Sequence, residues 1–176
     1  MNIHYEEISK KELLKLEELD RTEHIDYVYK YDNDSLVKSF LNITIPKWSN
    51  NKKDDFIQTL SEKIDKGGKA FGAFDGDKLA GISALGNRAW GNIAHLSFLH
   101  VSKDYRKQGI GRQLIKLVEN EALKRGYERL YVSATASVPT VNFYMNYGFK
   151  PTKKVIKEPY EEEPNDIHMV KDIKKE

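Results

Sequence analysis

Residues 93–125 combine an apolar strand pattern, a basic loop and an amphipathic helix pattern, in that order. The run 93–101 is apolar enough to be a central strand of a sheet. The pattern turns helical at Ile110, and Gly126 is well placed to end that helix. A helix that begins directly after a short loop points unpaired N–H groups and the positive end of its dipole at the loop. The segment therefore predicts an anion-binding site at the start of this helix.

Glycines and cations surround the predicted anion site. Gly109 and Gly111 let the backbone approach a ligand closely. The flanking cations are Lys103, Arg106, Lys107 and Arg112. A pyrophosphate at this position would receive hydrogen bonds from the backbone and charge-assisted ones from these side chains. A Gly-x-Gly loop alone is weak evidence, since an ordinary turn and helix cap has the same pattern.

The rest of the chain predicts a mixed α+β fold, largely antiparallel at first, with one strand-helix-strand unit in the second half. Further strands are predicted at residues 2–8, 69–74, 78–85, 130–134, 149–156 and 167–173. Further helices are predicted from Lys10, from a cap at Asp54 or Asp55 up to Gly67, and over residues 138–147. Segment 20–48 is interpreted as a β-hairpin or an irregular insertion, and 158–166 as an acidic loop.

Length and composition narrow the class of protein. A chain of 176 residues predicts one domain over residues 1–176, and its formal net charge of +2 gives no global field that would attract nucleic acid or membrane. The absence of cysteine excludes a disulfide framework, a thiolate nucleophile and a zinc site with sulfur ligands. No apolar stretch approaches the roughly 20 residues of a membrane span. We therefore expect a soluble cytoplasmic protein without a metal.

Two motifs resemble those of the GNAT (GCN5-related N-acetyltransferase) superfamily. The run Arg106-Lys107-Gln108-Gly109-Ile110-Gly111 is similar to its Arg/Gln-x-x-Gly-x-Gly/Ala signature. The run 142–149, Asn-Phe-Tyr-Met-Asn-Tyr-Gly-Phe, resembles its Phe-Tyr-x-x-x-Gly-Phe element. The resemblance covers roughly residues 69–173. It implies a mostly antiparallel central sheet flanked by helices, with a splayed central strand pair that forms an acyl-CoA cleft.

The resemblance also implies an activity and a set of site residues. It implies N-acetyl transfer from acetyl-CoA, as co-substrate, to a primary amine. Tyr144 matches the tyrosine that serves the leaving thiolate as general acid. The residues implied to contact acetyl-CoA are Leu99, His100 and Val101 through their backbone, Arg106, Lys107, Gln108, Gly109, Ile110, Gly111 and Arg112 at the pyrophosphate, and Ser137, which replaces a common asparagine.

The general base is left open by the sequence. Val132 occupies the position where some family members carry a glutamate, so the candidates are Glu23, His24, His95, His100 or an ordered water. Strict strand alternation places His95, Ser97 and Leu99 on one face and Leu96, Phe98 and His100 on the other. At most one of the two strand histidines should then face the cleft.

The acceptor is predicted only by class. Segments 20–48 and 158–166 are expected to wall its pocket, and their carboxylates beside aromatic rings suit a cationic amine, such as a polyamine, an aminoglycoside or a protein lysine. These residues are Glu23, Asp26, Asp32, Asp34, Glu161, Glu162 and Glu163, with Tyr27, Tyr29, Tyr31, Trp48 and Tyr160. A solvated acidic loop with core tyrosines has the same pattern.

Two other functions fit parts of the pattern. A non-catalytic acyl-CoA sensor would keep the loop and the cleft without turnover. A nucleotide or nucleic-acid binder is disfavoured, because the loop lacks the third glycine and the acidic ribose ligand of a dinucleotide fingerprint. We therefore expect acetyl-CoA and an amine as partners, without nucleic acid or membrane. A homodimer is left open.

Overall fold

The computed structural model describes residues 2–173, in which a seven-stranded sheet carries the fold. The strand order is β1-β4-β5-β6-β7-β9-β8, and every neighbouring pair is antiparallel except β6 and β7. The strand bounds are β1 Ile3–Ile8, β4 Lys69–Asp75, β5 Lys78–Trp90, β6 Ile93–Val101, β7 Arg129–Ala134, β8 Lys150–Pro151 and β9 Ile167–Asp172. The predicted mixed, mostly antiparallel α+β fold is confirmed.

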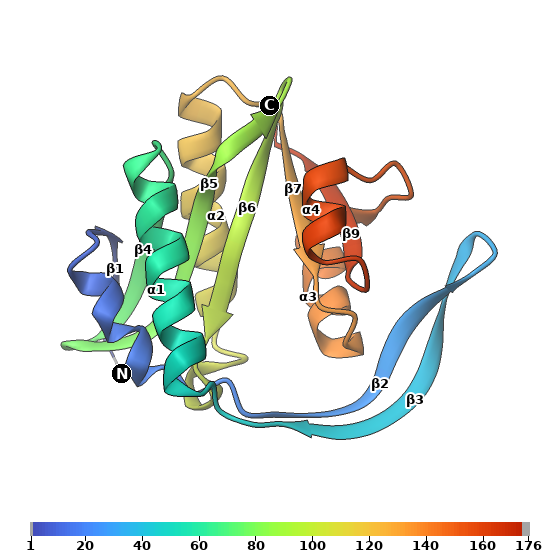
Figure 1. Cartoon of the computed structure of the whole chain (residues 1–176), viewed down its shortest axis with the longest axis horizontal. Coiled ribbons are helices and arrows are strands. Elements are labelled where there is room, and N and C mark those ends of the chain that lie inside the picture. Colours follow the sequence, from blue (N-terminus) through green and yellow to red (C-terminus); the bar gives the residue numbers. More distant parts are fainter. Residues whose placement is uncertain (1, 174–176) are drawn as a thin grey trace.

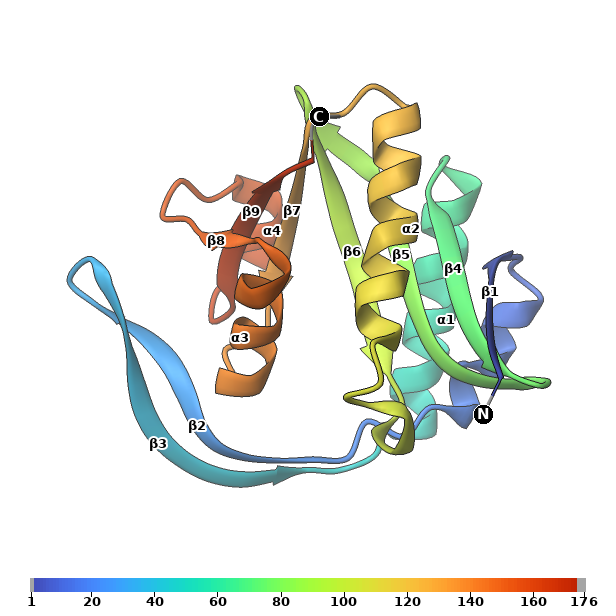
Figure 2. The ribbon, with the colours of Figure 1, turned by 180° about the vertical axis from the view of Figure 1, so that it is seen from behind.

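Helices cover both faces of the sheet (Figures 1 and 2). On one face, α2 packs Leu114, Ile115 and Val118 into the larger core cluster. On the other face, α1 and the short 3-10 helix η1 enclose a second cluster that contains Leu16 and Leu60. The helical bounds are η1 Glu12–Glu18, α1 Asn50–Asp65, η2 Lys103–Tyr105, α2 Ile110–Lys124, α3 Val138–Tyr147 and α4 Lys157–Glu162. In the described part of the chain, no helix has both the length and the apolar character of a membrane span.

The single parallel pair produces the splayed centre of the sheet. Strands β6 and β7 pair only through Ile93↔Arg129, Ala94↔Leu130 and His95↔Tyr131. Beyond His95, β6 continues beside β5 to Val101, while β7 follows β9 away from it. The two strands therefore separate and leave a V-shaped opening between them (Figure 1).

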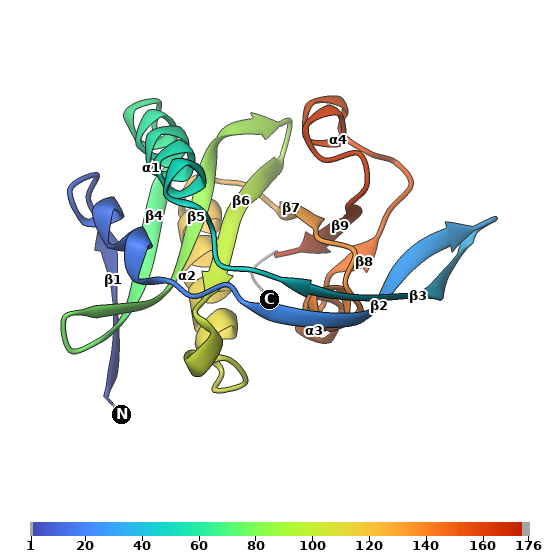
Figure 3. The same cartoon turned by 60° about the horizontal axis from the view of Figure 1, so that its bottom comes forward.

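Segment 20–48 is a β-hairpin, as one of its two interpretations predicted. Strands β2 (Glu23–Asp32) and β3 (Ser35–Ile45) form their own two-stranded sheet. This arm crosses the wide end of the opening and extends past α3 (Figures 1 and 3). It is attached there by the Tyr29 N–H, which donates to the Ala136 carbonyl at 2.7 Å, and by the Tyr29 hydroxyl, which donates to the Asn142 side chain at 3.0 Å.

Two predicted helix starts were wrong. The cap of α1 is Ser49, whose hydroxyl accepts a hydrogen bond from the Lys52 N–H, and Asp54 and Asp55 lie inside the helix. Serine caps as well as aspartate does, so the earlier start also satisfies the first turn. The helix predicted from Lys10 is a 3-10 helix that begins at Glu12, whose carboxylate accepts from the Ser9 N–H at 2.7 Å.

The predicted bounds of three other segments, 149–156, 158–166 and 78–85, were also wrong. The strand predicted over 149–156 is reduced to Lys150–Pro151, and one further hydrogen bond, from the Thr152 N–H to the His168 carbonyl at 2.9 Å, joins the chain to β9. The acidic loop 158–166 contains most of α4, which begins with Lys157. Strand β5 runs on to Trp90, past the predicted end at residue 85, through an irregular register opposite β6.

Candidate active site

The opening between β6 and β7 forms one large cleft. Its volume is about 1210 Å³, which exceeds the roughly 300–1,000 Å³ of a typical single-ligand pocket. Its walls come from the base of the β2–β3 arm, α1, β6, the loop before α2, the end of β7, α3 and the segment from α4 to β9. A cleft of this size and composition has room for two substrates.

The start of α2 has the geometry of a phosphate site. Gly109, the residue before the helix, has φ 81°, and Lys107 has φ 61°. The backbone hydrogen bonds of the helix begin with the Gln113 N–H, which donates to the Gly109 carbonyl. The N–H groups of the first turn, which precede Gln113, are therefore free for a ligand. A Cβ on Gly111 would lie 3.0 Å from the Phe143 ring, which explains glycine there.

The cations of this loop divide into two groups. Lys103, Lys107 and Arg112 line the cleft. Arg106 also lines it, but its guanidinium donates to the carbonyls of Val101 and Thr22, both at 3.1 Å, and thereby fastens β6 to the arm. The Gln108 side chain donates to the Asp104 carbonyl and is not among the cleft-lining residues. Its predicted contact with acetyl-CoA is therefore limited to the backbone.

A bulge in β6 changes which side chains face the cleft. Leu96 pairs with Leu85 and Phe98 pairs with Ala84, so Ser97 is an extra residue in β6. Before the bulge, Ala94 and Leu96 face the α2 core, whereas after it Leu99 and Val101 do. Both His95 and His100 consequently line the cleft, and the expectation that at most one would do so was wrong.

Neither strand histidine is suited to accept a proton at neutral pH. Burial lowers the pKa of His95 to about 3, assisted by the nearby charges of Lys63 and Arg88. Burial also lowers the pKa of His100 to about 3, assisted by Arg21 and Arg106. A base this weak takes a proton from an ammonium group poorly.

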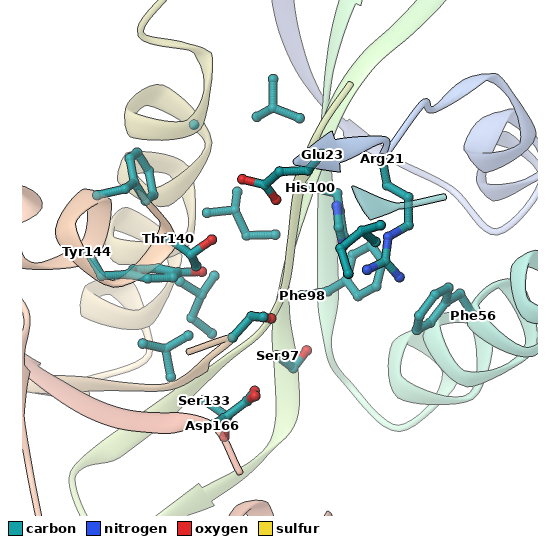
Figure 4. A pocket seen from close by; sticks show the side chains of 18 of the residues that line it. Arg21, Glu23, Phe56, Ser97, Phe98, His100, Ser133, Thr140, Tyr144 and Asp166 are labelled. Atoms are coloured by element: carbon teal, nitrogen blue, oxygen red, sulfur yellow. The ribbon is translucent and has the colours of Figure 1, made fainter. Parts of the chain in front are cut away.

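The other two base candidates differ from each other. His24 is half exposed, and its ring nitrogens contact Thr44 at 3.0 Å and Asp26 at 3.1 Å. Glu23 lines the cleft, and its carboxylate points toward the space between β6 and α3 (Figure 4).

Tyr144 is a buried tyrosine in the wall of the cleft. It comes from α3, is buried at 5% exposure, and lines the cleft opposite β6 (Figure 4). Within residues 2–173 its hydroxyl has no hydrogen-bond partner. Burial raises the pKa of Tyr144, and the charge of Asp166 raises it further. The phenol therefore keeps its proton at neutral pH and has it available for a ligand.

Ser137 caps α3 from below the cleft surface. Its hydroxyl accepts from the Thr140 N–H at 3.3 Å and donates to the Thr140 hydroxyl at 2.8 Å, and its side chain is 1% exposed. Thr140, on the first turn, faces the cleft instead (Figure 4). The contact implied between Ser137 and acetyl-CoA stays a prediction.

Asp166 is a cleft residue that the sequence did not single out. It immediately precedes β9, and pairing of Ile167 with Ala134 places it at the end of β7, beside Ser133 (Figure 4). Its carboxylate forms no ion pair or hydrogen bond within the described residues. Burial raises the pKa of Asp166 to about 6, and Glu163 adds to this effect. An acidic residue directly before a closing strand was the signal that could have indicated it.

Only part of the predicted acceptor wall faces the cleft. Glu23, Trp48, Glu162 and Glu163 line it, joined by Asp166. The remaining carboxylates and tyrosines, which do not line it, are Asp26, Asp32, Asp34, Glu161, Tyr27, Tyr29, Tyr31 and Tyr160. In the described part of the chain, no three His, Cys, Asp or Glu side chains gather as a metal site would require.

Comparison with known proteins places this cleft in a family. The sequence model of the acetyltransferase (GNAT) domain matches residues 44–170. An uncharacterized N-acetyltransferase, YsnE of Bacillus subtilis, is 30% identical over 104 residues, which cover 57% of this chain and 67% of YsnE. Streptothricin acetyltransferase of Streptomyces lavendulae is 35% identical over 76 residues, which cover 43% of this chain and 40% of that enzyme.

Solved structures share the fold across the whole chain. Nourseothricin acetyltransferase superposes with a TM-score of 0.73 at 18% identity, covering 99% of this chain and 100% of the other. A putative streptothricin acetyltransferase from Bacillus anthracis, solved with acetyl coenzyme A, gives 0.72 at 17% identity, covering 97% and 96%. The chain belongs to the GNAT acetyltransferase family. It is an acyl-CoA-dependent N-acetyltransferase whose co-substrate is acetyl-CoA.

Proposed function

We propose that the protein acetylates a primary amine of a small cationic molecule, with Tyr144 as general acid and Asp166 as general base. One observation carries the choice of acceptor class. Within residues 2–173, the carboxylates of Glu23, Glu163 and Asp166 line the cleft without an ion pair. An ammonium group that enters the cleft therefore meets acidic groups free to bind it.

Acetyl-CoA fits the opposite wall. The first turn of α2 offers free N–H groups, and Lys107 and Arg112 add positive charge for a pyrophosphate. The backbone of Leu99, His100 and Val101 lies beyond the last β6–β7 pair, so its β7-side edge is available to the pantetheine arm except at the Val101 carbonyl, which accepts from Arg106. When bound, acetyl-CoA supplies an activated acetyl thioester.

The chain's own groups then divide the proton transfers. An amine attacks only as the free base, so a group beside it must accept its proton. Asp166 is ionised above its pKa of about 6 and has no other partner in the described residues. On the α3 wall, the un-ionised hydroxyl of Tyr144 donates a proton to the leaving sulfur.

An acceptor panel tests this function. The protein is incubated with acetyl-CoA and, separately, spermidine, a streptothricin, lysine and a lysine-containing peptide, and the released thiol is measured. We expect turnover with at least one of these amines. CoA binding without turnover for every amine would favour the alternative, a sensor of acyl-CoA.

We also propose that the protein acts as one domain in the cytoplasm and forms a homodimer through the β2–β3 arm. The cytoplasm is where acetyl-CoA is supplied, and fractionation of cells tests this location. The evidence for the dimer is the set of apolar side chains that the arm exposes, of which Phe40 is 66% exposed. The others are Tyr27, Val37, Leu41 and Ile43. Apolar side chains on an open two-stranded sheet are usually covered by a partner.

A further inference from the structure

Arg21 enters the cleft from a fixed stretch of backbone between η1 and β2. On one side of it, the Asp20 N–H donates to the Ser102 hydroxyl at 2.9 Å, and the Asp20 carbonyl accepts from the Lys103 N–H at 2.7 Å. On the other side, the Thr22 carbonyl accepts from Arg106. The position of the Arg21 backbone is therefore tied to the end of β6 and the loop that follows it.

Among the described residues, no carboxylate lies within ion-pair distance of the Arg21 guanidinium. It stacks over the Trp48 ring at 5.6 Å, and no hydrogen bond or ion pair forms at it within residues 2–173. Burial lowers the pKa of Arg21, and Glu23 only partly offsets this from beyond ion-pair distance. Placing a cation in a partly dry site is unfavourable unless a partner binds it. Its planar set of N–H donors is thus left for a ligand.

The surroundings of Arg21 favour an oxygen-bearing group. The part of the cleft around Arg21, here called the corner, is walled by aromatic rings. The centroid of the Trp48 ring lies 4.4 Å from that of His100 and 4.9 Å from that of Phe56, and the Phe98 and Phe56 centroids are 5.1 Å apart. Trp48 Nε1 is the one buried side-chain donor without an acceptor in the described residues. Both strand histidines are neutral at physiological pH, so they do not repel a second cation or attract an anion. Arg21 is the cation stacked on Trp48 in this corner, whereas Lys52, over the Phe56 ring, is exposed.

We propose that Arg21 binds a carboxylate of the acceptor, so that the acceptor is an amino carboxylate such as a cationic amino acid. This inference rests on the proposed function and narrows its substrate class. A guanidinium fork matches a carboxylate with two parallel hydrogen bonds. Arg21 lies across the cleft from Tyr144 and Thr140, and Asp166 lies beside Ser133 at the end of β7 (Figure 4). The carboxylate and the amine of one molecule would thus contact Arg21 and Asp166 respectively.

Two pairs of probes that differ only in the carboxylate test this proposal without turnover. Lysine is compared with cadaverine, and phenylalanine with phenethylamine, by calorimetric titration into the protein saturated with CoA. We expect the carboxylate-bearing member of at least one pair to bind about 10-fold or more tightly than its partner. Arg21→Gln should abolish that preference, and Arg21→Lys should retain part of it.

Lys52→Gln is the matched control, since Lys52 also lines the cleft and stacks on an aromatic ring, at 4.9 Å from Phe56. It should leave the preference unchanged. Equal or absent binding within both pairs overturns the proposal, as does a preference that persists in Arg21→Gln. A loss of CoA affinity in Arg21→Gln also overturns it, by assigning Arg21 to the phosphates. None of these outcomes depends on thiol release, which tests the acetyl transfer itself.

Discussion

Tyr144 and Asp166 both line the side of the cleft that β7, α3 and the segment before β9 form, and burial raises the pKa of both. The tyrosine hydroxyl is protonated at neutral pH even at its ordinary pKa of 10, and burial, by raising that pKa, makes it a weaker acid. For the aspartate, a pKa of about 6 gives a carboxylate that is ionised at neutral pH yet more basic than an exposed one. Burial therefore makes Asp166 a stronger base for its proposed role, whereas the role proposed for Tyr144 rests on its position in the cleft wall.

Tyr144→Phe removes only the hydroxyl that is proposed to protonate the leaving thiolate. General acid catalysis typically contributes about 10²- to 10⁴-fold, so kcat should fall by that order. CoA affinity should stay the same, because the ring keeps its packing against Phe143 and Phe149. Steady-state kinetics with the amine found in the panel, together with CoA titration, measure both quantities. An unchanged kcat would remove Tyr144 from the mechanism.

Asp166→Asn tests the base through the pH profile. In the wild type, kcat/KM should fall as pH drops through about 6, because Asp166 becomes protonated and cannot accept the amine proton. In the variant, this limb should vanish and the rate should be low at every pH. Glu163→Gln, which alters the neighbouring carboxylate, should move the limb to lower pH without removing it.

The same substitution has a signed effect on stability. The pKa of Asp166 is about 6 in the folded protein against an ordinary value of 3.8, so its contribution to stability is lost as pH rises through about 6. Asp166→Asn should therefore raise the melting temperature at pH 8 and leave it nearly unchanged below pH 4. Thermal unfolding at the two pH values measures the difference. A variant that is destabilised at pH 8 would contradict the raised pKa.

The residues proposed for the site differ in whether a short stretch of sequence is enough to indicate them. Tyr144 and the loop before α2 could be predicted because short motifs carry them. Asp166 could not, because its position beside Ser133 depends on the register between β7 and β9, which brings distant segments together. Arg21 was missed for the same reason: its relation to Trp48 comes from the path of the arm.

Among the elements, β6 determines the site most strongly. Its bulge at Ser97 reverses the alternation of side chains and brings His100 to the cleft. Periodicity in sequence counts two residues per repeat and contains no sign of an inserted residue, so strict alternation was wrong here. By contrast, the bounds of β6 and α3 were predicted correctly, since turns and glycine mark their ends.

Two glycines at opposite ends of α2 have the same backbone conformation, so substitutions at the two positions can be compared directly. Gly109 and Gly126 have φ of 81° and 85°, and a Cβ on either would meet no atom within 4 Å. Alanine at either position should cost about 1 kcal/mol of folding free energy because of the left-handed conformation. Only Gly109→Ala should also weaken CoA binding, since only that residue precedes the phosphate-binding turn. Denaturant unfolding and CoA titration separate the effects, and equal CoA affinities in the two variants would contradict the assignment.

At the scale of the whole molecule, the fold class followed from the sequence patterns and the splayed sheet from the resemblance to the GNAT superfamily, while the position of the arm did not follow from either. Aromatic and β-branched residues in segment 20–48 predicted strands, but they are spread over a sheet that packs on α3 through few contacts, such as that of Tyr29. Where such an arm lies is set by long-range packing. The predicted acceptor wall was consequently only partly correct.

The exposed apolar face of the arm gives a prediction about assembly. Phe40→Glu should convert the proposed dimer into a monomer, because it places a charge in the covered interface. Light scattering coupled to gel filtration measures the mass of both proteins. Lys116→Glu, on the exposed side of α2, controls for the added negative charge and should leave the dimer intact. A monomeric wild type would contradict the proposal.

The central claim is that this cleft moves an acetyl group from CoA to an amine. Isotopically labelled acetyl-CoA is incubated with the protein and each amine of the panel, and mass spectrometry follows the label. The account predicts labelled acetyl on the amine nitrogen, with one free CoA released for each acetyl transferred. Label that remains on protein-bound CoA with every amine would contradict it.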